Sequence, residues 1–232
     1  MLLRTDHLDF AYGEAKVLHG IDLSVEARKI TCVIGRNGVG KTTLLKALMG
    51  VLRARSGKVW LADKDVTALP AHQRAKLGIN LVPQGRDIFP GLTVEENLRI
   101  GLEARTDGLK EIPEDIYGLF PVLRTMKGRR GGDLSGGQQQ QLAIGRALAG
   151  NPGVLLLDEP TEGIQPSIIK EIGQVLKKLA VERGITIVLV EQYLDFVREI
   201  GDSFVLMNRG RIVHQGLTRE LSKATVSEHL QV

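Results

Sequence analysis

One octapeptide restricts what this chain can fold into more than any other feature. Residues 35–42, GRNGVGKT, match the phosphate-loop pattern G-x-x-x-x-G-K-[ST] at every fixed position. An apolar, β-branched run over 30–34 precedes the octapeptide, and a helical pattern over 41–49 follows it. In such a loop the glycines let backbone N–H groups wrap around an anion at the positive end of a helix. The sequence therefore predicts a strand, a loop and a helix that bind the phosphates of ATP or GTP.

Two side chains of this loop carry specific chemistry. Lys41 would neutralise the β- and γ-phosphates, and the hydroxyl of Thr42 would coordinate Mg²⁺. A dinucleotide site is not expected, because the glycines do not follow G-x-G-x-x-G spacing. The predicted nucleotide-binding residues of the loop are Gly35, Arg36, Asn37, Gly38, Val39, Gly40, Lys41, Thr42 and Thr43.

Short β-branched runs alternate with helical patterns through most of the chain. Buried strands are predicted over 30–34, 79–82, 154–157 and 185–190, and helices over 41–49, 167–183 and 194–200. Because such alternation produces parallel sheets covered by helices, we predict an α/β fold, a P-loop NTPase core with a mainly parallel sheet. Strand-like residues over 17–25 and 58–61, joined by turns, predict an antiparallel β patch in the N-terminal third.

The strand signal disappears between residues 85 and 134. Thr93 and Glu96 form a capping box that predicts a helix to about Leu102, and a second helical pattern over 116–126 is broken near Pro121. We predict a single domain over 1–232, without internal repeats. Its core would comprise 1–84 and 135–216, with an inserted α-helical subdomain over 85–134 and a C-terminal helix and tail over 217–232.

Two carboxylates, Asp158 and Glu159, follow the predicted strand over 154–157. Functional groups gather at the carboxyl ends of parallel strands, where the phosphate loop also lies. We predict that Asp158 holds Mg²⁺, directly or through water, and that Glu159 orients or deprotonates the water that attacks the γ-phosphate. The alternative interpretation is a strand that merely ends in two acids.

Composition excludes several other classes of protein. The net charge of +4 is typical of a mixed-sign surface, and the basic residues clustered over 124–130 fit a solvated face as well as an acidic partner. Cys32 is the single cysteine, which excludes an intrachain disulfide and a multi-cysteine zinc site and suits a reducing compartment.

We find no signal peptide and no apolar run long enough to span a bilayer, so a cytoplasmic location is expected. The five histidines have no metal-ligand spacing: His7, His19, His72, His214 and His229.

The pentapeptide LSGGQ over 134–138 narrows the class. Ser135 and Gln138 form a capping box for a helix to about Ala149, and the pentapeptide resembles the signature of ABC-type ATPases. Gln84 falls at the position of that family's Q-loop, and Tyr12 resembles its adenine-stacking aromatic residue. These motifs occur in the family's order between about residues 4 and 216. The resemblance adds Tyr12 and the signature residues to the predicted ATP site: Ser135, Gly136, Gly137 and Gln138.

The resemblance also implies a mechanism. Two nucleotide-binding units would stack head to tail, with ATP enclosed between residues 35–43 of one unit and 135–138 of the other. Gln84 would contact Mg²⁺ or the attacking water, and the insertion over 85–134 would carry the motion to a membrane partner. The expected partners are transmembrane permease subunits, a second ABC ATPase subunit (self or homologous), and indirectly a solute-binding protein, but no nucleic acid. The chain would lie peripherally on the inner face of the cell membrane.

Two positions depart from the family pattern. Gln192 stands where the family usually has a catalytic His, and Gln165 stands where an Asp is common. An amide can bond a γ-phosphate oxygen, but it brings neither a titratable proton nor a positive charge. We therefore expect weak ATP hydrolysis by this chain alone and a homologous partner that carries the His.

The same departures bear on the transported substrate. Val190-Glu191-Gln192 resembles the ATP-binding subunits of importers for branched-chain amino acids and related amides. Within that group, residues 137–142 (GQQQQL) and 162–167 (EGIQPS) resemble the urea-importer subunit more than the amino-acid one. Residues 35–40 and 191–195 show the same similarity. The resemblance implies urea uptake, with a branched-chain amino-acid or short-chain amide importer as the alternative.

Two other classes of P-loop protein remain as competing hypotheses. A soluble ABC ATPase acting on ribosomes or DNA typically has two cassettes or a long coiled-coil insertion, and this chain has neither. A GTPase should contain an Asn-Lys-x-Asp motif, which is absent here.

Overall fold

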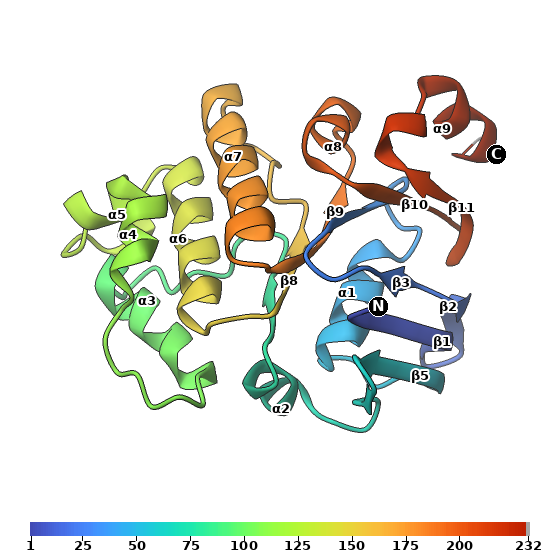
Figure 1. The fold of residues 1–232 in the computed structure, drawn as a ribbon, viewed down its shortest axis with the longest axis horizontal. Helices are drawn as coiled ribbons and strands as arrows, with labels where there is room; N and C mark the ends of the chain where they lie inside the picture. Colours follow the sequence, from blue (N-terminus) through green and yellow to red (C-terminus); the bar gives the residue numbers. More distant parts are fainter. Residues whose placement is uncertain (231–232) are drawn as a thin grey trace.

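The computed structural model describes residues 1–230, apart from the side chains of Lys223, His229 and Leu230, so the expectation for His229 lies outside the described side chains. Figure 1 shows two sheets, with the helices of residues 94–182 gathered on the left and the N-terminal sheet on the right. The strands are β1 (Leu3–Tyr12), β2 (Ala15–Ile21), β3 (Ser24–Val25), β4 (Ile30–Ile34), β5 (Ser56–Leu61), β6 (Lys64–Asp65), β7 (Ile79–Val82), β8 (Val154–Asp158), β9 (Thr186–Glu191), β10 (Ser203–Asn208) and β11 (Arg211–Leu217). The α-helices are α1 (Lys41–Met49), α2 (Ala71–Lys76), α3 (Val94–Gly101), α4 (Glu114–Leu119), α5 (Pro121–Thr125), α6 (Gly136–Ala149), α7 (Pro166–Glu182), α8 (Leu194–Ile200) and α9 (Lys223–Leu230), and the short 3₁₀ turns are η1 (Leu102–Ala104), η2 (Gly131–Asp133) and η3 (Thr218–Glu220).

The central sheet confirms the predicted α/β fold. Its strand order is β11-β10-β4-β9-β8-β7, and within the described chain every pairing in it is parallel except the β10–β11 hairpin. Every residue of β4, β8 and β9 is buried. Both faces of these strands are covered, which explains why they are continuous apolar runs rather than alternating ones.

The antiparallel N-terminal sheet was also predicted, but its strand β1 and its two-residue strand β6 were not. The strand order is β2-β1-β5-β6, with β3 paired to β1. The β1 strand escapes detection because its alternation of buried and exposed residues is broken: its register with β5 shifts between Asp6 and Asp9, and His7 has φ of 46°. The hairpin of β10 and β11 was not assigned either, and β11 has no wholly buried residue in its pattern.

Two hydrophobic cores lie on opposite faces of the central sheet, and alternate residues of its strands point into each. In β4, Cys32 and Ile34 join the core formed with α3–α8, whereas Val33 joins the core shared with α1 and the N-terminal sheet. In β8, Leu155 and Leu157 likewise face the first core. The α1 helix is therefore packed between the two sheets, which positions the loop that precedes it.

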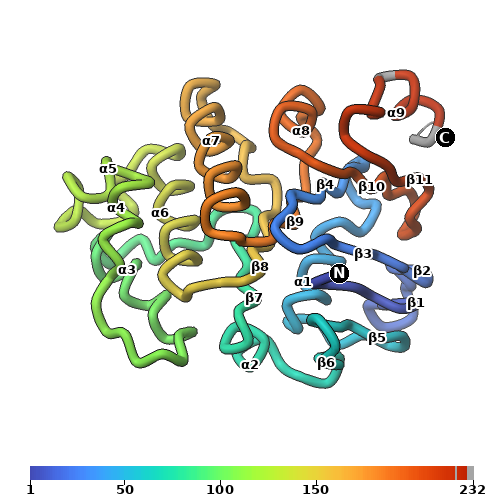
Figure 2. The backbone as a smooth tube through the Cα atoms, viewed as in Figure 1, coloured from blue at the N-terminus to red at the C-terminus, as the bar shows by residue number. Residues whose placement is uncertain are grey.

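The segment over 85–134 contains helices and no strand of either sheet. Thr93 and Glu96 form the predicted capping box of α3, and the predicted break near Pro121 separates α4 from α5. The α3 helix packs closely on α6, because Gly101 has no side chain: a Cβ there would lie 2.0 Å from the carbonyl oxygen of Arg146. Figure 2 shows α3–α6 stacked side by side, far from the C-terminal helix α9.

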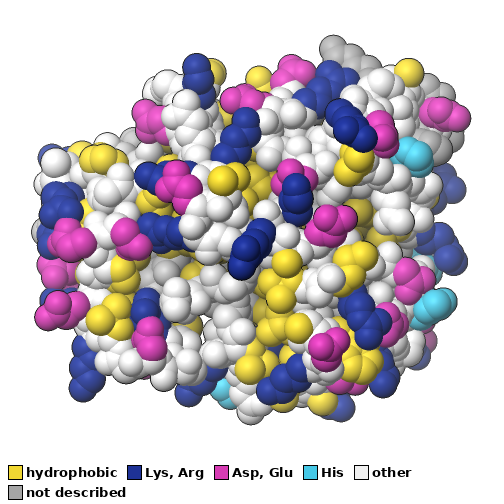
Figure 3. Space-filling model, viewed as in Figure 1, with side chains coloured by type: hydrophobic (Ala, Val, Ile, Leu, Met, Phe, Trp, Pro, Cys, Tyr) yellow, Lys and Arg dark blue, Asp and Glu magenta, His cyan; other side chains and the backbone are white. Residues whose placement is uncertain are grey.

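The surface carries charges of both signs. Lys and Arg side chains are interspersed with Asp and Glu over the face in Figure 3. In the basic run, Arg124 pairs with Glu114, and Arg124 and Lys127 both lie over the Tyr117 ring. These contacts match a solvated face. Among the described residues, no helix is both long and apolar enough to cross a membrane.

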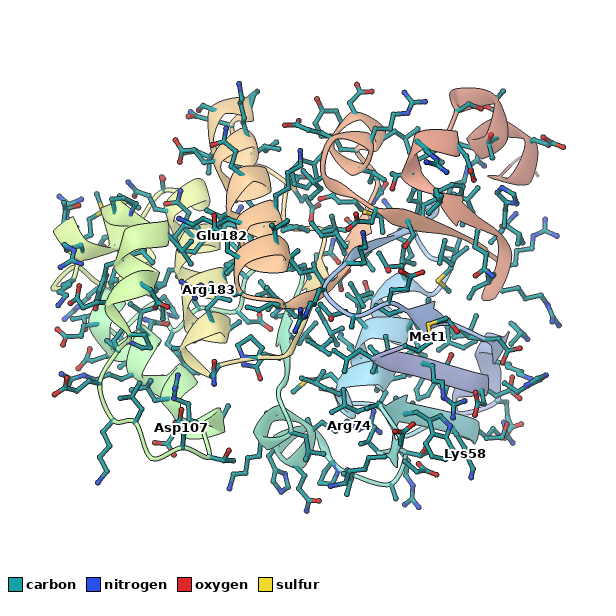
Figure 4. All side chains as sticks on the ribbon, in the orientation of Figure 1. Met1, Lys58, Arg74, Asp107, Glu182 and Arg183 are labelled. Carbon is teal, nitrogen blue, oxygen red and sulfur yellow. The ribbon has the colours of Figure 1, made fainter. Side chains whose placement is uncertain are left out.

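One buried cation ties α1 to α2. Arg74 is 2% exposed, and its guanidinium donates to the carbonyl oxygens of Ala47 and Leu48 (both 2.8 Å), Thr67 (2.9 Å) and Leu69 (3.0 Å). Figure 4 marks Arg74 beside the end of α1. A cation at the carboxyl end of a helix satisfies its unpaired carbonyls and its dipole. Arg74 therefore holds the helix that carries the phosphate loop.

We predict that Arg74→Met lowers the free energy of unfolding by about 2–4 kcal/mol, because several buried carbonyls lose their donor. Arg183→Met is the matched control, since it removes a partly exposed pair with Asp115 at 2.9 Å (Figure 4) and should cost less than about 1 kcal/mol. Urea denaturation of both variants measures the difference. Equal losses would contradict the role of Arg74.

Candidate nucleotide-binding site

The predicted site residues gather where neighbouring strands of the central sheet end. Ile34 pairs with Glu191 at the ends of β4 and β9, Asp158 pairs with Val190, and Val82 pairs with Leu157. The residues that follow these strands are the phosphate loop, Glu159, Gln192 and Gln84. The parallel register thus brings together segments that are far apart in the sequence.

The phosphate loop has a backbone that requires glycine. Gly38 and Gly40 have φ of 79° and 105°, a region that side chains disfavour. Gly35 lies so close to β10 that a Cβ would be 2.5 Å from the carbonyl oxygen of Met207. Lys41 is 4% exposed, and its Nζ donates to the carbonyl oxygens of Gly35 (2.8 Å) and Arg36 (3.0 Å). The loop is therefore folded tightly around the ammonium group, at the amino end of α1.

The two acids occupy different environments. Asp158 is 3% exposed, and burial raises the pKa of its carboxyl, while a hydrogen bond with Thr42 and the charge of Lys41 oppose the rise. Its Oδ1 is buried without a hydrogen-bond partner among the described residues. Glu159 has φ of 48°, and its Oε1 lies 3.4 Å from Lys41 Nζ. This strained backbone directs the carboxylate toward the phosphate loop.

Two glutamines complete the cluster. Gln192 Nε2 donates to Glu159 Oε1 at 2.7 Å and to Asn37 Oδ1 at 2.6 Å, so it bridges Glu159 and the phosphate loop. Gln84 Nε2 lies 3.5 Å from Glu159 Oε2 and donates to Glu162 Oε2 at 3.0 Å. The structure therefore brings Gln84, Lys41, Glu159 and Gln192 into one constellation.

The signature segment lies apart from this constellation. Ser135 and Gln138 form the predicted capping box of α6, and residues 135–138 line a separate cavity of about 970 Å³ with Gln165 and parts of α4, α5 and α7. Tyr12 lies on the N-terminal sheet, 51% exposed and edge-on to Phe10. Trp60 on β5 bonds Asp6 through its indole nitrogen at 2.6 Å and lies under Arg4 and Lys58, which is a packing role.

The residues near Asp158 fit a magnesium ion. Mg²⁺ prefers hard oxygen ligands and takes only one or two of them from the protein, together with substrate phosphates. The unpartnered Oδ1 of Asp158 and the nearby hydroxyl oxygen of Thr42 are oxygen ligands of this kind. Among the described residues, no cluster of three His, Cys, Asp or Glu side chains could hold a metal without a substrate.

Sequence reasoning overlooked Glu162, Glu191 and the side chain of Asn37. Glu162 bonds Gln84, Asn37 bonds Gln192, and Glu191 is buried at the end of β9. These residues lie within patterns quoted above, but none of those patterns specifies what their side chains contact. Their contacts arise only when separate loops meet at the sheet edge.

Comparison with known proteins agrees with this geometry. A family model described as ABC transporter matches residues 18–162. The chain is 40% identical over 223 residues to the probable branched-chain amino acid transport ATP-binding protein LivF of Archaeoglobus fulgidus, covering 95% of this chain and 94% of that protein. It is 38% identical to the high-affinity branched-chain amino acid transport ATP-binding protein BraG of Pseudomonas aeruginosa, covering 91% of each. The structure matches that of the dimeric bacterial ABC transporter cassette MJ0796 with a TM-score of 0.85 and 26% identity, covering 95% of this chain and 100% of that one.

We predict that Lys41→Ala weakens ATP binding by roughly ten- to hundredfold, because charge-assisted bonds to the phosphates are lost. Lys58→Ala is the control, since it removes an exposed ammonium group of β5 (Figure 4). Equilibrium binding of a fluorescent ATP analogue measures both variants. Unchanged affinity in Lys41→Ala would refute the role of this lysine.

Proposed function

The chain belongs to the ABC transporter family, and from this premise we propose that it is the ATP-hydrolysing subunit of an importer of branched-chain amino acids. It is an ABC-type ATPase coupled to transport. The observation that carries the proposed substrate is the match to LivF and BraG over nine-tenths or more of all three chains.

The relatives support this substrate better than they support urea. Both proteins are named for branched-chain amino acid transport, which was the alternative in the sequence analysis. The features that favoured urea, residues 137–142 and 162–167, lie in α6 and at the start of α7 of a subunit that binds nucleotide. Because such residues would not touch the cargo, similarity over the whole chain is the better guide to it.

In the proposed reaction, the predicted site residues act on ATP or on water. Lys41 and the loop amides bind the β- and γ-phosphates, and Gln192 bonds a γ-phosphate oxygen. Glu159 orients the attacking water and accepts its proton, with Gln84 beside it. Thr42 and Asp158, with Gln84, would hold Mg²⁺, which neutralises phosphate charge when bound.

A second copy or a homologous subunit would complete the site. Residues 135–138 line a cavity to which no phosphate-loop residue contributes, which supports the proposal that they meet the nucleotide of another subunit. The similar cassette MJ0796 is dimeric, which supports a site shared by two subunits, and we propose that they stack head to tail. Tyr12 would stack on the adenine of the nucleotide held by its own chain.

The remaining partners are proposed from the family. The helical insertion over 85–134 would transmit the motion of the ATPase subunits to the permease subunits. We propose that this insertion is a subdomain, beside a core of 1–84 and 135–216 and a C-terminal segment of 217–232. A solute-binding protein would act indirectly, and the chain would lie on the inner face of the cell membrane. Because Gln192 lacks the proton and charge of a His, we propose that the chain hydrolyses ATP weakly without a homologous partner.

We predict that Glu159→Gln abolishes turnover but leaves ATP bound, because the amide cannot accept the proton of the attacking water. The variant should therefore accumulate as an ATP-bound dimer. Size-exclusion chromatography with light scattering, together with phosphate release, measures both effects. Glu182→Gln, on the exposed end of α7 (Figure 4), should behave as wild type. Normal hydrolysis by Glu159→Gln would show that Glu159 is not the base.

The cargo is tested by deleting the gene and restoring it as wild type or as Glu159→Gln. Uptake of labelled leucine should fall on deletion and return only with the wild-type gene, whereas uptake of labelled urea should not change. Loss of urea uptake with normal leucine uptake would replace the proposed cargo by urea. Co-purification with ribosomes or DNA rather than permeases would overturn the transport role itself.

A further inference from the structure

Glu191 is a buried carboxylate to which the reaction proposed above assigns no role. It is the last residue of β9, 2% exposed, and it pairs with Ile34 of β4, while the preceding Val190 pairs with Asp158 of β8. Glu191 takes part in no ion pair among the described residues, although removing a carboxylate from water is costly. Burial raises the pKa of this carboxyl, and the hydrogen bonds to it oppose the rise.

Both oxygens of Glu191 accept hydrogen bonds, and each oxygen serves a different loop. Oε1 accepts from the hydroxyl of Thr161 at 2.7 Å and from its backbone N–H at 3.2 Å. Oε2 accepts from the backbone N–H groups of Gln192 at 2.9 Å and Tyr193 at 3.3 Å. Every backbone partner is a donor, so an ionised carboxylate, which only accepts, satisfies this set fully.

These bonds fasten the two loops that carry the reacting side chains. Glu159 lies two residues before Thr161, and its own N–H donates to the carbonyl oxygen of Val190 at 3.0 Å. The strained turn at Glu159 is therefore held to the end of β9 on both sides. Because Gln192 directly follows Glu191, the same carboxylate also fixes the backbone of the amide that bonds Glu159.

We propose that Glu191 is a positioning residue for ATP hydrolysis, which sets the separation of Glu159 and Gln192 by bonding Thr161 on one side and the Gln192 backbone on the other. The inference rests on the proposed roles of Glu159 and Gln192. An error of about 1 Å in the placement of reacting groups can reduce a rate about a hundredfold. Glu191 thus contributes to kcat without touching ATP.

The first test is Glu191→Gln, which keeps the shape but turns an NH₂ group toward backbone donors. We expect kcat for ATP hydrolysis to fall roughly ten- to hundredfold, while the affinity for a non-hydrolysable ATP analogue changes less than about threefold. The full chain is assayed with its co-purified transporter subunits, and Glu182→Gln provides the same chemical change on the surface. Wild-type kcat in Glu191→Gln, or equal losses of kcat and ATP affinity, would overturn the proposal.

A second pair of variants is informative even if Glu191→Gln fails to fold. Thr161→Val removes the hydroxyl that bonds Glu191 but preserves the shape, whereas Thr161→Ser retains the hydroxyl. We expect Thr161→Val to lower kcat with ATP affinity preserved, and Thr161→Ser to restore most of the loss. Equal rates in the two variants would show that the hydrogen bond does not position the site.

A double-mutant cycle shows whether Glu191 acts through Gln192. If it does, Gln192→Ala lowers kcat, and adding Glu191→Gln to the Gln192→Ala variant lowers kcat by a further factor of less than about three. If the double variant instead loses kcat by the product of the two single losses, Glu191 does not act through Gln192. If Gln192→Ala alone leaves kcat unchanged, the role of Gln192 in the proposed function fails, and the inference fails with it. If Gln192→Ala lowers kcat but Glu191→Gln does not, only the inference fails.

Discussion

The parallel register of β4, β9 and β8 is the constraint on which the rest of the site depends. Ile34 pairs with Glu191, and Asp158 pairs with Val190, so the carboxyl ends of the three strands lie at the same edge of the sheet. The loops that leave this edge carry Lys41, Glu159 and Gln192, whose polar atoms lie within 3.4 Å of the neighbouring group. Because β-strands are rigid and both faces of this sheet are packed, the loops inherit a fixed spacing. A shift of one residue in either pairing would turn alternate side chains to the opposite core.

Buried charge accompanies this geometry, and local hydrogen bonds compensate it. The ammonium of Lys41 is bonded by loop carbonyls, and the carboxylate of Glu191 is bonded by amides and a hydroxyl. Asp158 is the exception, since its Oδ1 has no partner among the described residues and burial raises its pKa. An incompletely satisfied carboxylate destabilises the protein without its ligand and is suited to a cation. The site therefore combines rigid, satisfied supports with one group reserved for binding.

Much of the fold was predictable because local patterns and tertiary structure agree. The strand before the phosphate loop, the helix after it and the capping boxes at Thr93 and Ser135 all lie where the sequence predicts them. The β1 strand was missed because an irregular register interrupts its alternation near His7. Contacts of Glu191 with Thr161 and of Glu162 with Gln84 were not predictable, since no residue pattern specifies which loops meet. The cargo could not be derived from the site, because residues that bind nucleotide do not contact it.

The sequence by itself determined the chemistry of this protein: a glycine-rich loop with Lys41 and Thr42, two acids at a strand end, and a separate signature segment. Spacing was sufficient for this, because turns, caps and strand ends are set by nearby residues. Only the tertiary structure decided which of these groups lie together. It joined Gln84, Glu159 and Gln192 beside the phosphate loop and left residues 135–138 lining a separate cavity. The physical reason is that side-chain contacts between distant segments depend on sheet order and register, which are fixed by packing both faces of the sheet at once.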